Sequence, residues 1–445
     1  MNMELHPAPY CPKEFVNRAE ELDLIRKDIV QIGKGQSLDQ PIVHFYGVPR
    51  IGKTWLLNHL AEQYKSPSSS LPSIVVLLLD CQTIAGAADV QSALLQVCKA
   101  ERKEMSAVQD IPTLVEVFKT LATQAVLLFL LDTAEGLQDE DFGWLETEIL
   151  EPLVLTGRVL IVVAGRAKAP RWQRLEMKRR VRYWPIRPFD YSMTVKQLRK
   201  VGLATSAAKI YSYTHGHPHA SRQLAEIPDP RKKAKVLQAL EPVEVELLRH
   251  VPPDRRDLVR GIAVLRHFNI GTLRAFLSRL MGAAYGKKSD AFYMDLLKEG
   301  LGNPDWLSWD QQSRSYIFAP TVRHILLARL RLAAPQLYQE SHRAALNLYE
   351  RWWIDLYPQN SVRFLVEAIY HQVAMWEISR QDQEQLRCEL GNLLKQRLTK
   401  SNFSTEQAVE LEHALQEDQE LQLPPAVLEW LLRQCRRFKE SCAAL

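Results

Sequence analysis

Residues 47–54 read GVPRIGKT, and they lie between the apolar stretch PIVHFY (41–46) and the segment WLLNHL (55–60). The octapeptide matches the pattern G-x-x-x-x-G-K-[ST], in which backbone N–H groups of a glycine-rich loop surround a phosphate. The motif is specific only between a strand and a helix. Here the apolar run before it predicts a strand and the periodicity after it predicts a helix. We therefore predict a phosphate-binding loop, with Arg50 at a position where many such loops carry glycine.

The composition is that of a soluble globular protein with several domains. The chain has 445 residues, of which 46% are hydrophobic and 24% are charged. The N-terminus has no apolar segment behind a basic start, and the apolar runs 74–79 and 125–131 are too short to span a bilayer. Six cysteines lack metal-ligand spacing, and a net charge of +5 does not by itself indicate nucleic acid. We expect a cytoplasmic protein with reduced thiols and no membrane contact.

Apolar runs alternate with helical patterns in the first part of the chain. The predicted strands are PIVHFYG (41–47), SIVVLLLD (73–80), AVLLFLLD (125–132) and RVLIVVAG (158–165). Such alternation predicts a parallel sheet with right-handed crossovers, and continuous apolar runs indicate strands buried on both faces. The fold class that follows is α/β, of the P-loop type.

The strands stop near residue 190, and helical patterns follow. WLSWDQQSRSYIFAP (306–320) interrupts them with two aromatic runs that predict a β-hairpin, as in a winged helix. In the last segment, Tyr338, His342, Ala345 and Tyr349, and likewise Phe364, Ala368 and His371, fall at helical-face spacing. The predicted domains are an irregular segment 1–14, a nucleotide-binding domain 15–189, a helical lid 190–238, a winged-helix domain 239–335 and a C-terminal helical array 336–445.

Two acidic residues follow a buried strand and complete the predicted site. Lys53 is expected to reach the β/γ-phosphate oxygens, and the Thr54 hydroxyl to hold Mg²⁺. Asp132 ends the strand 125–132, where its carboxylate can hold Mg²⁺ as well, and Glu135 can orient the attacking water. Asp80 is an alternative to Asp132, but it lacks a following acid. A solvated, non-catalytic Glu135 is the other interpretation.

Three further features have both a functional and a structural interpretation. Arg166 ends the strand segment VLIVVAGR (159–166), so it can sense a γ-phosphate or anchor a loop. The run 166–184 holds eight Lys/Arg against one Glu; it can face nucleic acid, although a solvated helix face is the commoner explanation. THGHPHA (214–220) is close to a metal pattern, but Gly-His-Pro more simply predicts a sharp turn.

Taken together, residues 13–350 resemble the STAND NTPases, the AAA+-related signal-transduction ATPases. The similar motifs are FVNRAEEL (15–22), GVPRIGKT (47–54), LLFLLDTAE (127–135), VVAGR (162–166), GHP (216–218), YIFAPTVR (316–323) and LYQESHRAALNLYERW (337–352). The resemblance implies an AAA+-like sheet domain followed by helical, winged-helix and repeat-type helical domains.

The resemblance also implies how a nucleotide is held. In the family the entry motif packs beside adenine, and the proline of the Gly-x-Pro motif lies against the base. The residues implied to bind ATP or ADP are Phe15, Val16, Arg18, Gly47, Val48, Pro49, Arg50, Ile51, Gly52, Lys53, Thr54, Trp55 and Pro218. Two departures are Arg50 and Ala319, the latter at a position where many relatives have a histidine that contacts the ADP phosphate.

The function implied is a STAND-type ATP/ADP switch for signal transduction. Slow ATP hydrolysis resets such a switch, the ATP form oligomerises, and a protein effector or sensor partner acts in trans, in prokaryotic defence or regulation. One alternative is a nucleic-acid-directed ATPase or transcription regulator that uses the basic segment 166–184 or the winged helix near residues 273–288. A scaffold that binds nucleotide without turnover is the third hypothesis.

Overall fold

The computed structural model divides the chain into two compact units. The first comprises Met1–Arg249, Asn303–Ser308 and Ala319–Ile325, and the second comprises His250–Gly302, Trp309–Phe318 and Leu326–Leu445. The residues described are 10–65, 71–84, 86–101, 110–166, 170–203, 206–227, 232–300, 306–311, 313–355, 361–379, 382–400, 403–418, 420–421 and 423–443.

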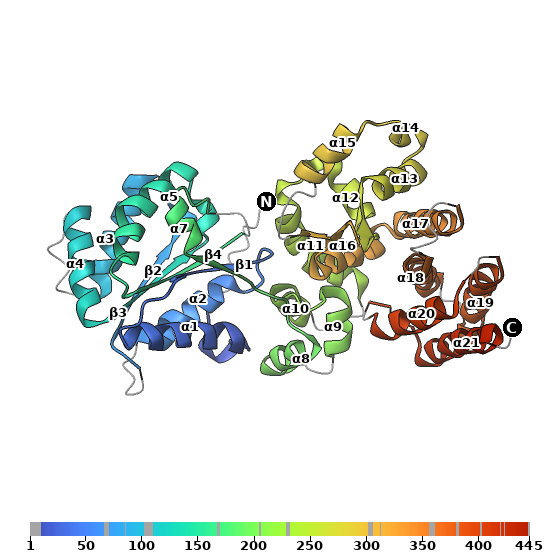
Figure 1. The fold of residues 1–445 in the computed structure, drawn as a ribbon, viewed down its shortest axis with the longest axis horizontal. Helices are drawn as coiled ribbons and strands as arrows, with labels where there is room; N and C mark the ends of the chain where they lie inside the picture. Colours follow the sequence, from blue (N-terminus) through green and yellow to red (C-terminus); the bar gives the residue numbers. More distant parts are fainter. Residues whose placement is uncertain are drawn as a thin grey trace. The chain divides into compact units, whose positions relative to one another are not determined.

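A five-stranded parallel sheet forms the centre of the first unit (Figure 1). Its strands are β1 (Ile42–Tyr46), β2 (Ile74–Asp80), β3 (Val126–Asp132), β4 (Val159–Gly165) and β5 (Val181–Pro185). The spatial order is β2-β3-β4-β1-β5, and the pairs are parallel. The carboxyl ends of all strands therefore meet at one edge of the sheet. The four strands predicted from the apolar runs are confirmed.

The fifth strand corrects one interpretation of the sequence. A solvated helix face was the favoured interpretation of the run 166–184, with a nucleic-acid face as the alternative. Among the described residues of this run, only Leu175–Arg179 (α7) is helical. Residues Val181–Pro185 pair with β1 at the sheet edge, and their side chains alternate between more and less buried positions. The strand was not predicted because one face of this edge strand is exposed. Its sequence, VRYW, therefore includes polar residues and lacks the continuous apolar run of a strand buried on both faces.

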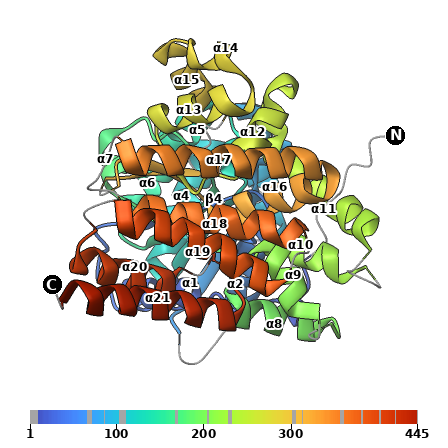
Figure 2. The ribbon, with the colours of Figure 1, turned by 90° about the vertical axis from the view of Figure 1, so that its right-hand side faces the viewer.

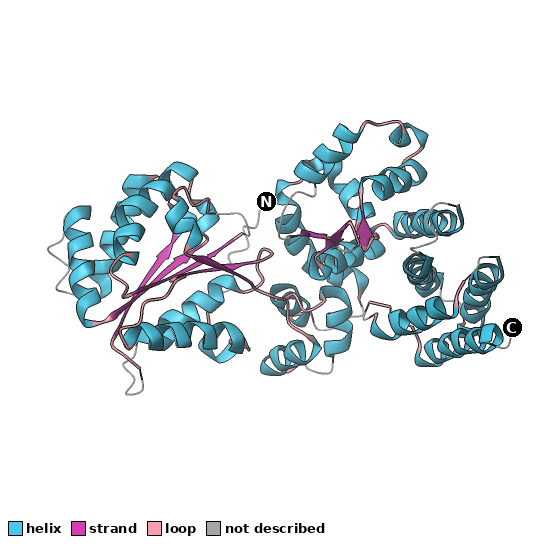
Figure 3. Ribbon diagram, in the orientation of Figure 1, coloured by secondary structure: helices cyan, strands magenta, loops and turns pink. Residues whose placement is uncertain are grey.

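Helices cover both faces of this sheet (Figures 1 and 3). One face packs on α1 (Ala19–Gly33) and α2 (Lys53–Lys65). The helices associated with the other face are α3 (Ala87–Glu101), α4 (Ile111–Gln124), α5 (Asp139–Leu145), α6 (Glu151–Val154) and α7. There, Phe118 of α4 meets Phe129 of β3 edge-to-face, with ring centroids 6.4 Å apart. Burial on both faces explains why β3 and β4 are apolar throughout.

Four helices after the sheet complete the main part of the first unit. They are α8 (Tyr191–Lys200), α9 (Ala207–Thr214), α10 (Pro218–Ala225) and α11 (Lys233–Leu247). His215 and Gly216 turn the chain between α9 and α10 with positive φ angles of 44° and 78°. A Cβ at Gly216 would lie 1.7 Å from the carbonyl oxygen of Phe189, so only glycine fits. The predicted sharp turn is confirmed.

The second unit begins with short helices and a small sheet. The elements are α12 (Arg256–Ile262), β6 (His267–Phe268), α13 (Ile270–Leu280), α14 (Ala283–Gly286), α15 (Asp290–Asp295), β7 (Leu307–Asp310) and β8 (Ser315–Phe318), and then α16 (Pro320–Ala333), which is shared between the units. The strand order is β6-β8-β7, and β6 pairs antiparallel with β8. Strands therefore form on both sides of the predicted hairpin turn.

Long helices make up the remainder of this unit. They are α17 (Pro335–Asp355), α18 (Ser361–Ser379), α19 (Gln383–Lys400), α20 (Thr405–Glu417) and α21 (Pro425–Ala443). Figure 2 shows α17 and α18 side by side, and their contact is the most extensive between any two helices. The faces predicted from spacing, at Tyr338, His342, Ala345 and Tyr349 and at Phe364, Ala368 and His371, are buried. No described helix is long and apolar enough to cross a membrane.

Candidate functional site

The loop between β1 and α2 has the backbone of a phosphate cradle. Gly47, Arg50 and Gly52 adopt positive φ angles of 156°, 60° and 103°. The Lys53 ammonium donates to the carbonyl oxygens of Gly47 at 2.7 Å and Val48 at 3.1 Å. Arg50 occupies a left-handed conformation that costs a non-glycine residue about 1 kcal/mol, so the glycine common at this position has a physical reason.

The structure brings the loop and Asp132 together. The Thr54 hydroxyl donates to Oδ1 of Asp132 at 3.1 Å, and Asp132 is buried. Asp80 lies beside Asp132 in the register of β2 and β3, but its carboxylate accepts from the backbone N–H of Gln82 at 2.9 Å. The geometry therefore agrees with Asp132 rather than Asp80 as the partner of the loop.

The carboxyl edge of the sheet gathers negative charge at this point. Burial raises the pKa of Asp132; together with the charges of the nearby Asp80 and Glu135, and against the hydrogen bonds from Thr54 and Thr133, it brings the pKa to about 6. Close carboxylates resist joint ionisation, which a divalent cation would relieve. Hydroxyl and carboxylate oxygens are also the donors that Mg²⁺ prefers. The residues present thus fit a magnesium ion at Thr54 and Asp132.

Glu135 and Arg166 form an ion pair at the same edge. Glu135 lies in a short 3₁₀ helix, Ala134–Gly136, that follows β3, and Arg166 directly follows β4. Oε1 of Glu135 is 3.8 Å from Nε of Arg166, and each side chain is about a quarter exposed. The two candidates are therefore neighbours, and neither is a freely solvated surface group.

Arg18 connects the entry motif to the loop. Its buried guanidinium donates from Nη1 to the carbonyl of Arg187 at 2.7 Å and from Nη2 to the carbonyl of Ile51 at 2.8 Å. The group also lies over the ring of Phe189, 4.8 Å from its centroid, and 3.6 Å from Oε1 of Glu21. Its hydrogen bonds thus hold the backbone of the phosphate loop.

The aromatic residues of the entry segment pack on helix α2. Phe15 stacks on His59 with ring centroids 3.9 Å apart, and Tyr10 meets Trp55 edge-to-face at 5.5 Å. Val16 is buried. The entry segment therefore packs on α2, the helix that follows the loop, and a base-binding role of Phe15, Val16 and Trp55 stays a prediction.

His217 belongs to the GHP motif (216–218), but the sequence interpretation gave its side chain no role in the nucleotide site. Its buried imidazole contacts the carbonyl of Pro49 from Nε2 at 3.0 Å and accepts from the backbone N–H of Ala220 at Nδ1 at 3.2 Å. An acceptor at Nδ1 places the proton on Nε2. Burial lowers the pKa of His217 to about 4, and the positive charges of Lys53 and Arg50 act in the same direction. The ring is therefore neutral and donates to the loop.

A second contact joins α10 to the loop. Nη1 of Arg50 donates to Nε2 of His219 at 2.9 Å, so this arginine is directed toward α10. Burial lowers the pKa of Arg50, and Glu246 of α11 partly restores it. Pro218 opens α10 and its carbonyl accepts from Gln197 at 2.9 Å. The signal for His217 was available in the sequence, because a polar residue directly before a helix-initiating proline is an N-cap.

The basic run 166–184 is largely neutralised by acidic neighbours. The ion pairs are Arg171–Asp139 at 3.1 Å, Arg174–Glu151 at 3.2 Å, Arg179–Glu176 at 3.8 Å and Arg182–Asp28. Residues 167–169 lie outside the described part of the chain. Paired arginines release fewer counterions on meeting a phosphate backbone, so this segment favours nucleic acid less than its composition indicates.

Ala319 precedes α16, and its N–H donates to the carbonyl of Trp306 at 2.6 Å. It carries no imidazole, but His324 lies five residues further along. The ring of His324 stacks on His215 of the α9–α10 turn, with centroids 4.3 Å apart and planes 5° from parallel. A histidine of α16 thus reaches the turn that precedes His217, within the first unit.

Solved structures share this fold at low sequence identity. A Walker-type ATPase of Pyrococcus abyssi matches with a TM-score of 0.52 and 16% identity, over 73% of this chain and 98% of that chain. The ORC2 protein of Aeropyrum pernix, in a structure with ADPNP and ADP, gives a TM-score of 0.40 at 11% identity over 75% and 97%. Cdc6p of Pyrobaculum aerophilum gives 0.37 at 13% over 73% and 97%.

At 16% identity, the similarity to the Walker-type ATPase is a similarity of fold. No protein-family model matches the chain, and no curated protein matches it. The predicted fold class, an α/β P-loop sheet of AAA+-like type followed by a helical region, is confirmed.

Proposed function

We propose that the chain is an ATP- and ADP-binding molecular switch of STAND type, which hydrolyses ATP slowly. The observation that carries the proposal is the hydrogen bond from His217 to the carbonyl of Pro49 at 3.0 Å. It connects the helical segment α8–α11 directly to the phosphate loop. Any nucleotide that rearranges the loop must therefore change the environment of α10.

Nucleotide binding is supported by the groups around the loop. A β-phosphate in the loop would accept from its N–H groups and from those at the start of α2. The Lys53 ammonium now contacts two loop carbonyls, and phosphate oxygens are stronger acceptors for it. The base would lie between the entry residues Phe15 and Val16 and the start of α10 at Pro218.

Hydrolysis would use the carboxyl edge of the sheet. Mg²⁺ bound at Thr54 and Asp132 would neutralise phosphate charge and orient the β- and γ-oxygens. Glu135 would hold the attacking water, and Arg166 would sense the γ-phosphate. Because Glu135 and Arg166 are paired at 3.8 Å, a γ-phosphate that attracts Arg166 would also free Glu135 to accept from water.

The remaining assignments follow the domain pattern. Residues 190–238 would form the lid, 239–335 a winged-helix domain, and 336–445 a sensor or partner-binding region. The ATP form would oligomerise and engage a protein effector in trans, in prokaryotic defence or regulation. A trigger can favour that form only by its different affinity for the two states.

The direct experiment identifies the nucleotide that co-purifies and the particle size with ADP and with ATP. The proposal expects tightly held ADP in a monomer, and assembly when ATP replaces it. Size is measured by light scattering after chromatography. An empty site in both conditions, together with no ATP binding by calorimetry, would overturn the proposal.

A second experiment tests the contact between α10 and the loop. His217→Ala removes the donor to Pro49, and we expect ADP to dissociate about 10-fold faster, because a lost hydrogen bond is worth about 1 kcal/mol or more. His413→Ala is the control, since the partner of His413 within the described residues is Glu417, on the surface of α20. Release is followed by displacement of a fluorescent ADP analogue. Equal ADP dissociation rates in the two variants would show that the contact between His217 and Pro49 does not help to retain the nucleotide.

A further inference from the structure

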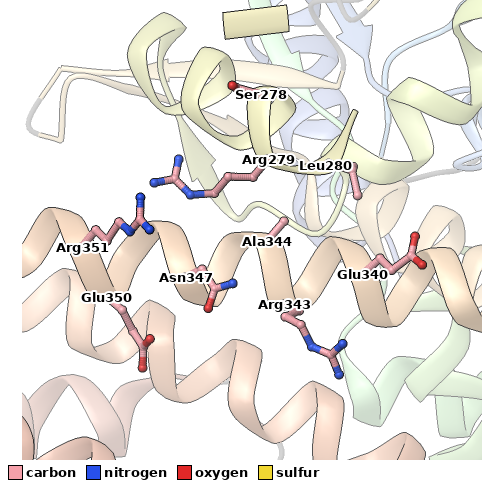
Figure 4. Close-up of a pocket in the computed structure, with 9 residues that line it drawn as sticks. All are labelled: Ser278, Arg279, Leu280, Glu340, Arg343, Ala344, Asn347, Glu350 and Arg351. Atoms are coloured by element: carbon pink, nitrogen blue, oxygen red, sulfur yellow. The ribbon is translucent and has the colours of Figure 1, made fainter. Parts of the chain in front are cut away.

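A cavity of about 710 Å³ lies within the second unit. None of its lining residues belongs to the phosphate loop or to the elements next to it in the sequence. It is formed by the end of α13 and the outer face of α17 (Figure 4). Its lining residues are Ser278, Arg279, Leu280, Glu340, Arg343, Ala344, Asn347, Glu350 and Arg351. This volume is ordinary for the site of a small ligand.

Two arginines converge across this cavity. In Figure 4, Arg279 extends from α13 toward Arg351, which rises from α17 to meet it. On α17, Glu340, Ala344, Asn347 and Arg351 follow at intervals of three and four residues, so they form one stripe that faces the cavity. The cavity wall thus brings two guanidinium groups to one end of this stripe.

The acidic lining residues do not neutralise this pair. Among the described residues, neither Arg279 nor Arg351 forms an ion pair with a carboxylate. Figure 4 shows the carboxylate of Glu350 directed away from α13 and Glu340 at the other end of the stripe. One hydrogen bond of Arg279 goes to the carbonyl of Ala275 at 3.0 Å, at the end of α13 where the helix dipole favours a cation. For Arg351, no such hydrogen bond is found among the described residues.

Two guanidinium groups that converge without a carboxylate partner among the described residues favour a bound anion. Burial, and then the charge of Arg351, lower the pKa of Arg279, which shows that the two groups repel each other in this setting. A bound anion would reverse that repulsion. A carboxylate supplies one negative charge for two guanidinium groups, whereas a phosphate monoester supplies nearly two charges and three acceptor oxygens.

We propose that the cavity between α13 and α17 binds the phosphate group of a small molecule, with Arg279 and Arg351 as its ligands. The site is separate from the phosphate loop, so the second unit would respond to a ligand of its own. The ligand chemistry is an unesterified phosphate or a phosphate monoester. Asn347, one turn before Arg351, is another polar lining residue of the cavity.

The test uses the full chain with Lys53→Ala, so that the phosphate loop does not contribute. Calorimetric titrations use inorganic phosphate, phenyl phosphate and benzoate. We expect both phosphates to bind and benzoate to bind at least 10-fold more weakly. Stronger binding of phenyl phosphate would identify a monoester site, and equal binding would identify a site for free phosphate.

Three variants in this background locate the site. Arg351→Gln and Arg279→Gln should each weaken phosphate binding at least 10-fold. Arg433→Gln is the control, because Arg433 lies on α21, is not a lining residue of the cavity and pairs with Glu429 at 3.8 Å; phosphate affinity should change less than 2-fold in this variant. Arg351 is exposed, so its replacement leaves the core intact, and unchanged thermal midpoints verify this.

Several outcomes would overturn the proposal. They are the absence of phosphate binding, equal effects of Arg351→Gln and Arg433→Gln, or equal affinity for benzoate. A DNA duplex that binds in an Arg351-dependent manner while phenyl phosphate does not would assign the site to nucleic acid instead. Failure of this test leaves ADP binding by the wild-type chain unaffected, so the two proposals are separable.

Discussion

Arg18 in the first unit and Arg266 in the second are both buried, with 6% and 7% of their surface exposed, but their partners differ. Arg18 donates to the backbone carbonyls of Arg187 and Ile51. Arg266 is paired closely with Glu367 at 2.9 Å and Asp418 at 2.5 Å, and Glu420 lies further away at 4.0 Å. The first arginine holds loops, and the second joins segments before α13, within α18 and after α20.

The pKa shifts follow from these partners. Burial lowers the pKa of Arg18, and Glu21 only partly offsets it. Burial also acts to lower the pKa of Arg266, but Glu367 and Asp418 raise it above its usual value. A cation that is satisfied mainly by carbonyl dipoles keeps its positive field, which favours an anion nearby. A cation between two carboxylates has no such field left. Buried charge thus holds the loop between β1 and α2 in the first unit and holds helices together in the second.

The largest expected effect concerns Arg266. Arg266→Met leaves Glu367 and Asp418 buried without their cation, and we expect a loss of about 3–5 kcal/mol in the free energy of unfolding. Arg331→Met is the control, because the Arg331–Glu377 pair at 2.7 Å is more exposed, and it should cost less than about 1 kcal/mol. Urea unfolding measures both, and similar losses would contradict the structural role of the triad.

A further variant sharpens this test. Arg266→Met combined with Glu367→Met removes one of the stranded carboxylates and should recover part of the loss, because apolar replacements of buried ion pairs are often tolerated. ADP affinity should stay within about 2-fold of the wild type in these variants. A loss of ADP binding without unfolding would show that the triad also serves the nucleotide site.

Lys53→Ala should lower ADP affinity and leave stability almost unchanged, the opposite of the Arg266 variants. Charge-assisted hydrogen bonds to phosphate contribute about 1.5–3 kcal/mol each, so we expect ADP affinity to fall about 100-fold or more. The free energy of unfolding without nucleotide should change by less than about 1 kcal/mol, because Lys53 is only half-buried. Calorimetric titration with ADP measures the affinity. Retained affinity would instead indicate a scaffold in which the phosphate contacts are dispensable.

Acid should destabilise the first unit through its buried histidines. The His44 ring is fully buried in β1 with neither nitrogen hydrogen-bonded within the described residues. Burial lowers the pKa of His44, like that of His217, to about 4, and nearby Lys53 acts in the same direction on both. Below the unfolded value near 6.5 the unfolded chain binds protons that the folded chain does not. Stability is therefore full above about pH 6.5 and is lost as the pH falls toward 4.

The expected slope is about 1.4 kcal/mol per pH unit for each histidine below pH 6.5. Urea unfolding at pH 7.5 and 5.5 measures it. His44→Phe, which fills a similar volume without a titrating group, should reduce the dependence, whereas His413→Ala should not. If His44→Phe keeps the wild-type pH dependence, then protonation of His44 does not contribute to the loss of stability in acid.

The smallest effect on stability is expected at Arg50, where backbone strain and a side-chain contact act in opposite directions. Arg50→Gly relieves the left-handed strain at φ 60° but loses the contact with His219 at 2.9 Å. Arg50→Ala loses the same contact and keeps the strain. We expect the alanine variant to be less stable than the glycine variant by about 1 kcal/mol. Thermal unfolding of both variants measures the difference, and its absence would indicate that the loop relaxes when the arginine is removed.

The sequence by itself determined the parts of this protein that depend on local pattern. Apolar runs predicted β1 to β4, because strands buried on both faces must be apolar at every position. The spacing of GVPRIGKT, with a strand before it and a helix after it, predicted the phosphate loop. The Asp132 position followed from the strand end, since the carboxyl ends of parallel strands share an edge.

Tertiary structure alone decided the rest. Strand β5 was not predicted, since its register against β1 depends on a partner 139 residues away at Ile42↔Val181. The buried donor of His217, the carbonyl partners of Arg18 and the meeting of Arg279 with Arg351 likewise join segments far apart in the chain. Hydrophobic periodicity reports which face of an element is buried, but it does not report what lies opposite that face. Partner choice for polar side chains is therefore settled only when the elements pack.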